Sequence, residues 1–131
     1  MTLLCTLTAC GHNSPPPATV ENTAAGSSAV ASDPTALGKT LYIKKGCTAC
    51  HTVDGSPRVG PSWKQPDWGK TIELASGGSV TMDESYLRES ILSPQAKARP
   101  GYPTVMPSFD GQLRDDELAG LIAYIKSLKQ P

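Results

Sequence analysis

The chain has 131 residues, with 12 Lys and Arg balanced by 12 Asp and Glu, so its formal net charge is zero. This balance argues against a nucleic-acid partner, which would call for a strongly basic surface. One Phe, two Trp and four Tyr supply few large apolar side chains, and so small a core usually needs a covalent or metal staple.

The first ten residues are apolar and uncharged, and they end in Leu7-Thr8-Ala9-Cys10, followed by Gly11. Small residues before such a Cys resemble the cleavage site of a bacterial lipoprotein, in which the Cys is lipidated and becomes the first mature residue. The segment is too short to span a bilayer. We therefore expect residues 1–10 to be a lipoprotein signal segment with Cys10 as the lipidation site. An ordinary N-terminal end is the alternative.

Residues 11–33 are rich in Ser, Pro, Ala, Thr, Asn and Gly and contain no Lys or Arg. Such a composition buries too little apolar surface to offset the entropy of ordering, so we expect a flexible tether. Residues 34–131 are then one small domain.

The domain is expected to begin with a helix over Thr35–Lys45. Asp33 is a suitable N-terminal cap, Pro34 suits the first turn, and Leu37 and Leu41 fall in helical register. Gly46 ends the helix.

The five residues that follow, Cys47-Thr48-Ala49-Cys50-His51, have the Cys-x-x-Cys-His spacing at which a c-type haem is attached. Two thiols three residues apart can each add to a haem vinyl group, while the adjacent imidazole reaches the iron. A zinc site would need further Cys or His ligands, and a thioredoxin-like pair would follow a strand. A chance Cys pair beside a surface His is the remaining alternative.

Three further elements are expected downstream. Residues 71–81 alternate around Gly77-Gly78 and predict a small hairpin. A second helix, capped by Asp83, runs to Leu92, where Ser93-Pro94 stops it. A third helix runs from Asp115 or Asp116 to about Leu128, with acids at its start and lysines near its end.

The second axial ligand decides what a haem can do, and Met is a common choice. Met1 lies in the leader, Met82 follows the predicted hairpin, and Met106 lies in a loop stiffened by prolines. Because prolines reduce the entropy lost when a loop is fixed, we predict that Met106 binds the iron opposite His51. Met82 is the alternative, and core packing is the ordinary role of a buried Met.

Over nearly everything after the tether, the chain resembles small bacterial cytochromes c with His/Met-ligated haem. The resemblance implies a mostly α cytochrome c fold of about three to four helices around one covalent haem c, with a small β-hairpin. Parts of it are similar to the cytochrome c domain of cytochrome c oxidase subunit II and to the single-haem lipoprotein subunit of alternative complex III. The matching positions are Gly38, Tyr42, the haem motif, Gly60-Pro61, Met106-Pro107 and Leu121–Tyr124.

The resemblance also implies roles around the haem. Gly38 would let the first helix cross the last one closely against Tyr124, and the Pro61 carbonyl would accept the Nδ1 proton of His51. Haem propionates would bond to three side chains, for which the alternatives are ordinary packing and a solvated arginine: Trp63, Arg99 and Tyr102. The chain departs from the family at Arg114, where a Ser or Thr cap is usual, so we expect either that Asp115 caps the last helix or that the helix end is frayed.

These features predict a membrane-tethered one-electron carrier of a respiratory chain, lipid-anchored at the periplasmic or outer face of a bacterial membrane. Its partner would be a quinol-oxidising complex or a terminal oxidase. A haem enzyme or gas sensor with a labile sixth ligand, and a purely structural haem protein, are the alternatives. Two interpretations stay open for five of the lysines. They form either a basic ring that steers an acidic partner or part of a mixed solvated surface, and they are Lys39, Lys44, Lys45, Lys64 and Lys70.

Overall fold

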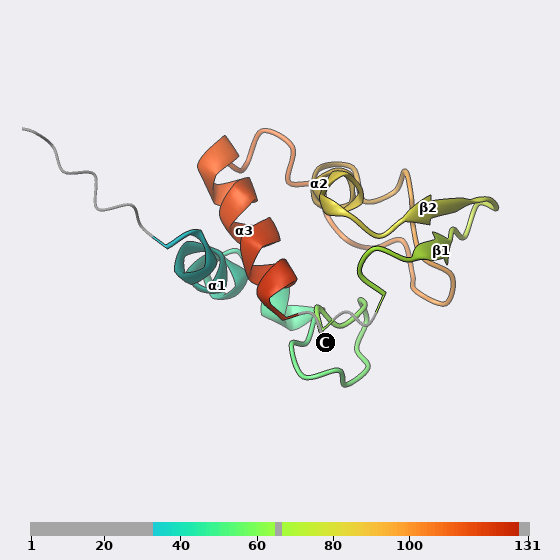
Figure 1. The fold of residues 1–131 in the computed structure, drawn as a ribbon, viewed down its shortest axis with the longest axis horizontal. Helices are drawn as coiled ribbons and strands as arrows, with labels where there is room; N and C mark the ends of the chain where they lie inside the picture. The colour runs from blue at the N-terminus through green and yellow to red at the C-terminus, as the bar shows by residue number, and fades with distance from the viewer. Residues whose placement is uncertain (1–32, 65–66, 129–131) are drawn as a thin grey trace, which may run out of the picture.

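The computed structural model describes residues 33–64 and 67–128 (Figure 1). The expected signal segment at 1–10 and nearly all of the expected tether at 11–33 lie outside these residues. Within them the elements follow in the order α1 (Pro34–Lys44), the 3₁₀ turn η1 (Cys47–Ala49), β1 (Thr71–Glu73), β2 (Ser79–Thr81), α2 (Glu84–Leu92) and α3 (Asp115–Ser127). The prediction of a mostly helical domain with a small hairpin is confirmed.

Local sequence signals account for the first and second helices. The Asp33 carboxylate accepts a hydrogen bond from the Thr35 backbone N–H at 2.9 Å, and the helix ends at Lys44, one residue earlier than expected. The Asp83 carboxylate caps α2 in the same way, accepting from the Tyr86 N–H at 2.9 Å. Both acids satisfy backbone donors that a helix start leaves without partners.

The expectation that Asp115 caps the last helix is wrong. Arg114 is the N-cap, and its backbone N–H donates to the Glu117 carboxylate at 3.0 Å. The Arg114 guanidinium also pairs with Asp116 at 3.0 Å. One of the two hydrogen bonds of a capping box runs from the backbone N–H of the cap residue to the side chain three residues on. Glu117 accepts that bond, and because it needs no particular side chain at the cap, a Ser or Thr is not required there.

The hairpin pairs Thr71 with Thr81, Ile72 with Val80 and Glu73 with Ser79 in antiparallel register. It connects to α2 through Met82, whose backbone N–H donates to the Lys70 carbonyl at 2.9 Å. The hairpin therefore fixes the position of the N-terminal end of α2.

The core forms where α3 lies between α1 and α2 (Figure 1). Its largest contribution is the apolar stripe of α3, which is 2–5% exposed at Leu118, Leu121, Ile122 and Ile125. Tyr42 from α1 and Ile91 from α2 pack against it. Among residues 33–64 and 67–128, no helix has the length and apolar character needed to cross a membrane.

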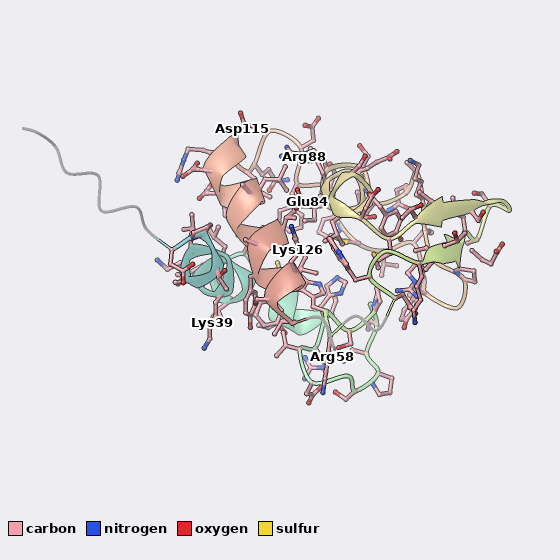
Figure 2. The ribbon with its side chains drawn as sticks, in the orientation of Figure 1. Lys39, Arg58, Glu84, Arg88, Asp115 and Lys126 are labelled. Carbon is pink, nitrogen blue, oxygen red and sulfur yellow. The ribbon has the colours of Figure 1, made fainter. Side chains whose placement is uncertain are left out.

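Charged side chains add a tie between α2 and α3. Lys126 and Glu84 form an ion pair between the two helices, and both side chains are labelled in Figure 2. The Lys126 ammonium also lies 5.6 Å from the ring centroid of Trp68. The pair is exposed, so its contribution to stability is small beside that of the buried stripe.

Two glycines permit the close crossing of α1 and α3. A Cβ on Gly38 would lie 1.9 Å from the Gly120 carbonyl oxygen and 2.7 Å from the Tyr124 Cβ. Gly120, which sequence reasoning missed, faces α1 in turn: its own Cβ would lie 3.1 Å from the Pro34 carbonyl oxygen. A glycine inside an apolar helix pattern is the signal that could have identified it.

We expect Gly38→Ala to destabilise the haem-loaded protein by about 2 kcal/mol or more, although Ala favours a helix by about 1 kcal/mol. The new methyl group would meet a backbone carbonyl, which no side-chain rotation relieves, so the two helices must separate. Thermal unfolding measures the effect. Lys39→Ala, on an exposed position of the same helix, is the control and should stay within about 0.5 kcal/mol of the parent. An equal stability of Gly38→Ala and the control would show that the crossing is not tight.

Candidate functional site

The Cys-x-x-Cys-His segment forms one compact turn. Gly46 adopts φ +76°, a left-handed conformation that reverses the chain after α1. The backbone N–H groups of Cys50 and His51 then donate to the Cys47 carbonyl at 3.2 and 2.9 Å. Both cysteines are free thiols, and burial raises the pKa of the Cys47 thiol. The turn therefore holds two thiols and one imidazole at the edge of a single cavity.

His51 is buried, with 8% of its surface exposed, and its ring is held by a backbone carbonyl. Nδ1 lies 2.7 Å from the Pro61 oxygen. Because a carbonyl can only accept, Nδ1 carries the proton and the lone pair is on Nε2. Burial lowers the pKa of His51, an effect that the Pro61 bond partly offsets. The ring is thus oriented as a neutral metal ligand, with the outer hydrogen bond that such ligands typically make.

Gly60 forms a close-fitting cradle for the same ring. A Cβ at this position would lie 2.5 Å from His51 Cε1 and 2.9 Å from Nδ1. The Gly60 N–H also donates to the Cys50 carbonyl at 2.8 Å. Any larger residue would push the imidazole away from its place, so this backbone position needs a glycine.

Two side chains that sequence reasoning did not connect with the motif hold its backbone. The Tyr42 hydroxyl donates to the His51 carbonyl at 2.5 Å. The Arg58 guanidinium donates to the Thr48 carbonyl at 2.5 Å. Tyr42 belongs to α1 and Arg58 to the loop after the motif, so the turn is held from both directions along the chain.

Trp63 packs behind His51 in an aromatic cluster. Its ring centroid lies 4.6 Å from that of Tyr42, 5.6 Å from that of His51 and 6.2 Å from that of Tyr124. Trp63 is 6% exposed. This cluster joins the motif to α1 and α3, so the imidazole lies against packed aromatic rings.

The cavity itself has a volume of about 340 Å³, within the range of small-molecule and cofactor sites. Its wall is largely apolar and comes from the haem motif, the Gly60-Pro61 segment, α2 and the loop that follows α2. The structure brings every site residue predicted from the described part of the sequence to this wall: Cys47, Cys50, His51, Pro61, Trp63, Arg99, Tyr102 and Met106.

Both candidate methionines also line the cavity, but they are held differently. Met82 is 2% exposed and belongs to the main core cluster. Met106 is half-buried in the loop between α2 and α3, where its carbonyl accepts a hydrogen bond from the Gln95 side chain at 3.2 Å. Met82 therefore already has a packing role that Met106 does not share.

Arg99 is not a solvated arginine, which was the alternative to its bonding a haem propionate. Its guanidinium pairs with Asp67 at 3.1 Å, and its side chain is 22% exposed. Of the five lysines considered for a basic ring, Lys45 lines the cavity, and its ammonium donates to the Gln112 carbonyl at 3.1 Å. Lys39 points outward from α1 (Figure 2).

These residues fit a covalent haem. A flat apolar macrocycle with a central iron requires two thiols at the attachment spacing, a neutral imidazole and a largely apolar cavity. All three are present here, and Gly60 leaves room for the imidazole. Among the residues that the structure describes, no group of three or more His, Cys, Asp and Glu side chains gathers as a metal site. Fold and site together define a small helical protein that carries one covalent haem c.

The family model for cytochrome c matches residues 35–129. The chain belongs to the cytochrome c family, whose members transfer electrons through their haem. In this chain Cys47, Cys50 and His51 form the haem-binding motif. No curated protein matches the chain as a relative.

Proposed function

We propose that the protein is a membrane-tethered one-electron carrier of a respiratory chain, with His51 and Met106 as the two axial ligands of its haem. The observation that carries the proposal is the arrangement around one cavity of an imidazole with a fixed tautomer and a thioether on a separate segment. When bound, the haem iron accepts and releases one electron.

The protein's own part is to hold the His51 ring in place. Pro61 keeps the His51 ring neutral and oriented through the 2.7 Å bond, and Gly60 leaves room for that ring alone. Ligands fixed in this way change little between oxidation states, so little reorganisation opposes electron transfer.

Met106 supports the carrier role better than Met82 does. A thioether is a soft ligand that favours the reduced iron and raises the reduction potential. Met106 lies between Pro103 and Pro107 in a loop tied to Gln95, whereas Met82 fills the core. We therefore assign Met106 to the iron and Met82 to packing. Trp63, Arg99 and Tyr102 are our candidates for bonding the haem propionates.

Two exposed apolar side chains at the cavity wall support transfer to a docked partner. Val59 is 48% exposed and Val105 is 64% exposed, and both line the cavity. We infer that the partner is a quinol-oxidising complex or a terminal oxidase, in keeping with the resemblance to oxidase subunit II and to the alternative complex III lipoprotein. The anchor would be lipid on Cys10, followed by the tether at 11–33.

The anchor is tested in cells that process lipoproteins. Cys10→Ala should move the cytochrome from the membrane fraction to the soluble fraction, or leave its leader uncut, with an unchanged visible spectrum. Stable anchoring needs two or more acyl chains, so the loss should be nearly complete. Electron transfer to the native membranes should fall with it.

Cys5→Ala is the matched control, because Cys5 lies upstream of the expected cut and should be removed during processing. An unmodified Cys10 in the mass spectrum of the mature native protein would refute the anchor. A high-spin spectrum with ready carbon monoxide binding in the unaltered protein would favour the enzyme or gas sensor instead.

A further inference from the structure

Gln95 connects the end of α2 to the backbone of Met106. Its side-chain amide donates to the Met106 carbonyl at 3.2 Å. Because a carbonyl can only accept, the amide presents its NH₂ group to Met106. Gln95 also lines the cavity, although sequence reasoning gave it no role there. Within the described residues, this bond is the only hydrogen bond that Met106 makes.

The backbone of Gln95 is held close to α2. Ser93 is the C-cap of the helix, and its N–H donates to the Glu89 carbonyl at 2.6 Å. The ring of Pro94 restricts the next residue. The Ala96 N–H then donates to the Ser93 carbonyl at 3.0 Å, which closes a turn around Gln95. The side chain of Gln95 therefore starts from a point that is fixed relative to α2.

The chain is held differently on the two sides of Met106. After Met106, two hydrogen bonds of 2.5 and 3.2 Å tie the loop to carbonyls at the end of α2, and the pairs are Ser108 with Leu92 and Phe109 with Ile91. Before Met106, residues 103–105 are exposed and make no hydrogen bond within the part of the chain that the structure describes. The Gln95 bond thus holds the loop at the point where the other ties end.

We infer that Gln95 is a positioning residue for the axial ligand, because its amide holds the backbone from which the Met106 thioether extends. The inference rests on the proposed assignment of Met106 to the iron. With that backbone held, the sulfur can leave only through rotations of its own side chain. Without the bond, the backbone at Met106 can move as well, so the state with the thioether unbound gains conformational entropy.

The bond should therefore determine how often the sixth position of the iron opens. A competing ligand binds only the fraction of molecules in which the thioether has left, so its apparent affinity rises in proportion to that fraction. Carbon monoxide is a suitable probe, because it competes with the thioether for the same position on the reduced iron.

Gln95→Glu tests the inference in the haem-loaded full-length protein. The carboxylate keeps the shape of the side chain but has no N–H to donate. The apparent affinity of the reduced protein for carbon monoxide should rise about threefold, a low value for one hydrogen bond because Gln95 is exposed. The sulfur-to-iron charge-transfer band should persist, because the thioether is still bound in most molecules. Gln95→Arg restores an N–H donor that stays protonated, and it should return the affinity to the parent value.

Gln112→Glu is the matched control. Gln112 lies in the same loop, and its amide donates to the Ser108 carbonyl at 2.7 Å. The substitution therefore removes the same kind of hydrogen bond and adds the same charge. Ser108 stays tied to α2 through its hydroxyl, so the backbone of Met106 remains held and the affinity for carbon monoxide should not change.

Three results would overturn the inference. If Gln95→Glu has the parent affinity while Met106→Ala abolishes the band, Gln95 does not position the ligand, and the proposed function stands. If Gln95→Glu and Gln112→Glu raise the affinity equally, the stability of the whole loop is responsible. If Met82 rather than Met106 proves to carry the band, the ligand assignment is wrong, and the inference falls with it.

Discussion

Met106→Ala should abolish the sulfur-to-iron charge-transfer band of the oxidised protein and lower its reduction potential by on the order of 100 mV or more. The substitution leaves water or a stray His to bind the iron, and either ligand is harder than sulfur and favours the oxidised state. Carbon monoxide binding to the reduced form should rise in step. Visible spectroscopy and a redox titration measure these changes.

Met82→Leu is the control for this experiment. Leu keeps most of the volume of a core side chain that is 2% exposed, so the band should remain and the stability should change by less than about 1.5 kcal/mol. The opposite pattern, with the band lost in Met82→Leu and kept in Met106→Ala, would move the axial ligand to Met82. The carrier hypothesis would survive that result, but the assignment would not.

The double variant Cys47→Ser with Cys50→Ser should contain no covalent haem and should be largely unfolded. Without haem the apolar wall of the cavity of about 340 Å³ faces water, and the remaining core is small for a domain of this length. The free energy of unfolding of so small a domain is low, and the loss of one covalent link to haem can exceed it. Haem staining after denaturing electrophoresis and limited proteolysis read out the two effects.

Thr48→Ser is the control, because Thr48 lies between the two cysteines and its substitution leaves both thiols in place. It should keep the haem and the protease resistance of the parent. Cooperative thermal unfolding of the double variant without haem would show that the polypeptide folds by itself, and it would contradict the view that haem attachment and folding are one event.

Much of the fold was predictable because its signals are local. Asp33 and Asp83 cap helices that start beside them, and Gly77-Gly78 lies in the turn of the hairpin between β1 and β2. The apolar stripe of α3 follows from its 3- and 4-residue spacing. The last helix was misjudged only at its cap, because the backbone N–H of Arg114 needs just the Glu117 carboxylate three residues on.

The kind of cofactor could likewise be predicted from five consecutive residues, since attachment of haem requires two thiols and an imidazole within one turn. The remaining contacts join different segments of the chain. Gly38 meets Gly120 at the helix crossing, the Tyr42 hydroxyl reaches the His51 carbonyl, and Arg99 pairs with Asp67.

The sequence by itself therefore determined the local elements and the kind of cofactor, because capping, periodicity and the haem motif act over a few residues. Only the tertiary structure decided how the residues around that cofactor are held. It placed Gly60 against the His51 ring, set Met82 in the core and tied the Met106 loop to the Gln95 side chain. Packing between distant segments sets these positions, and no local pattern records it.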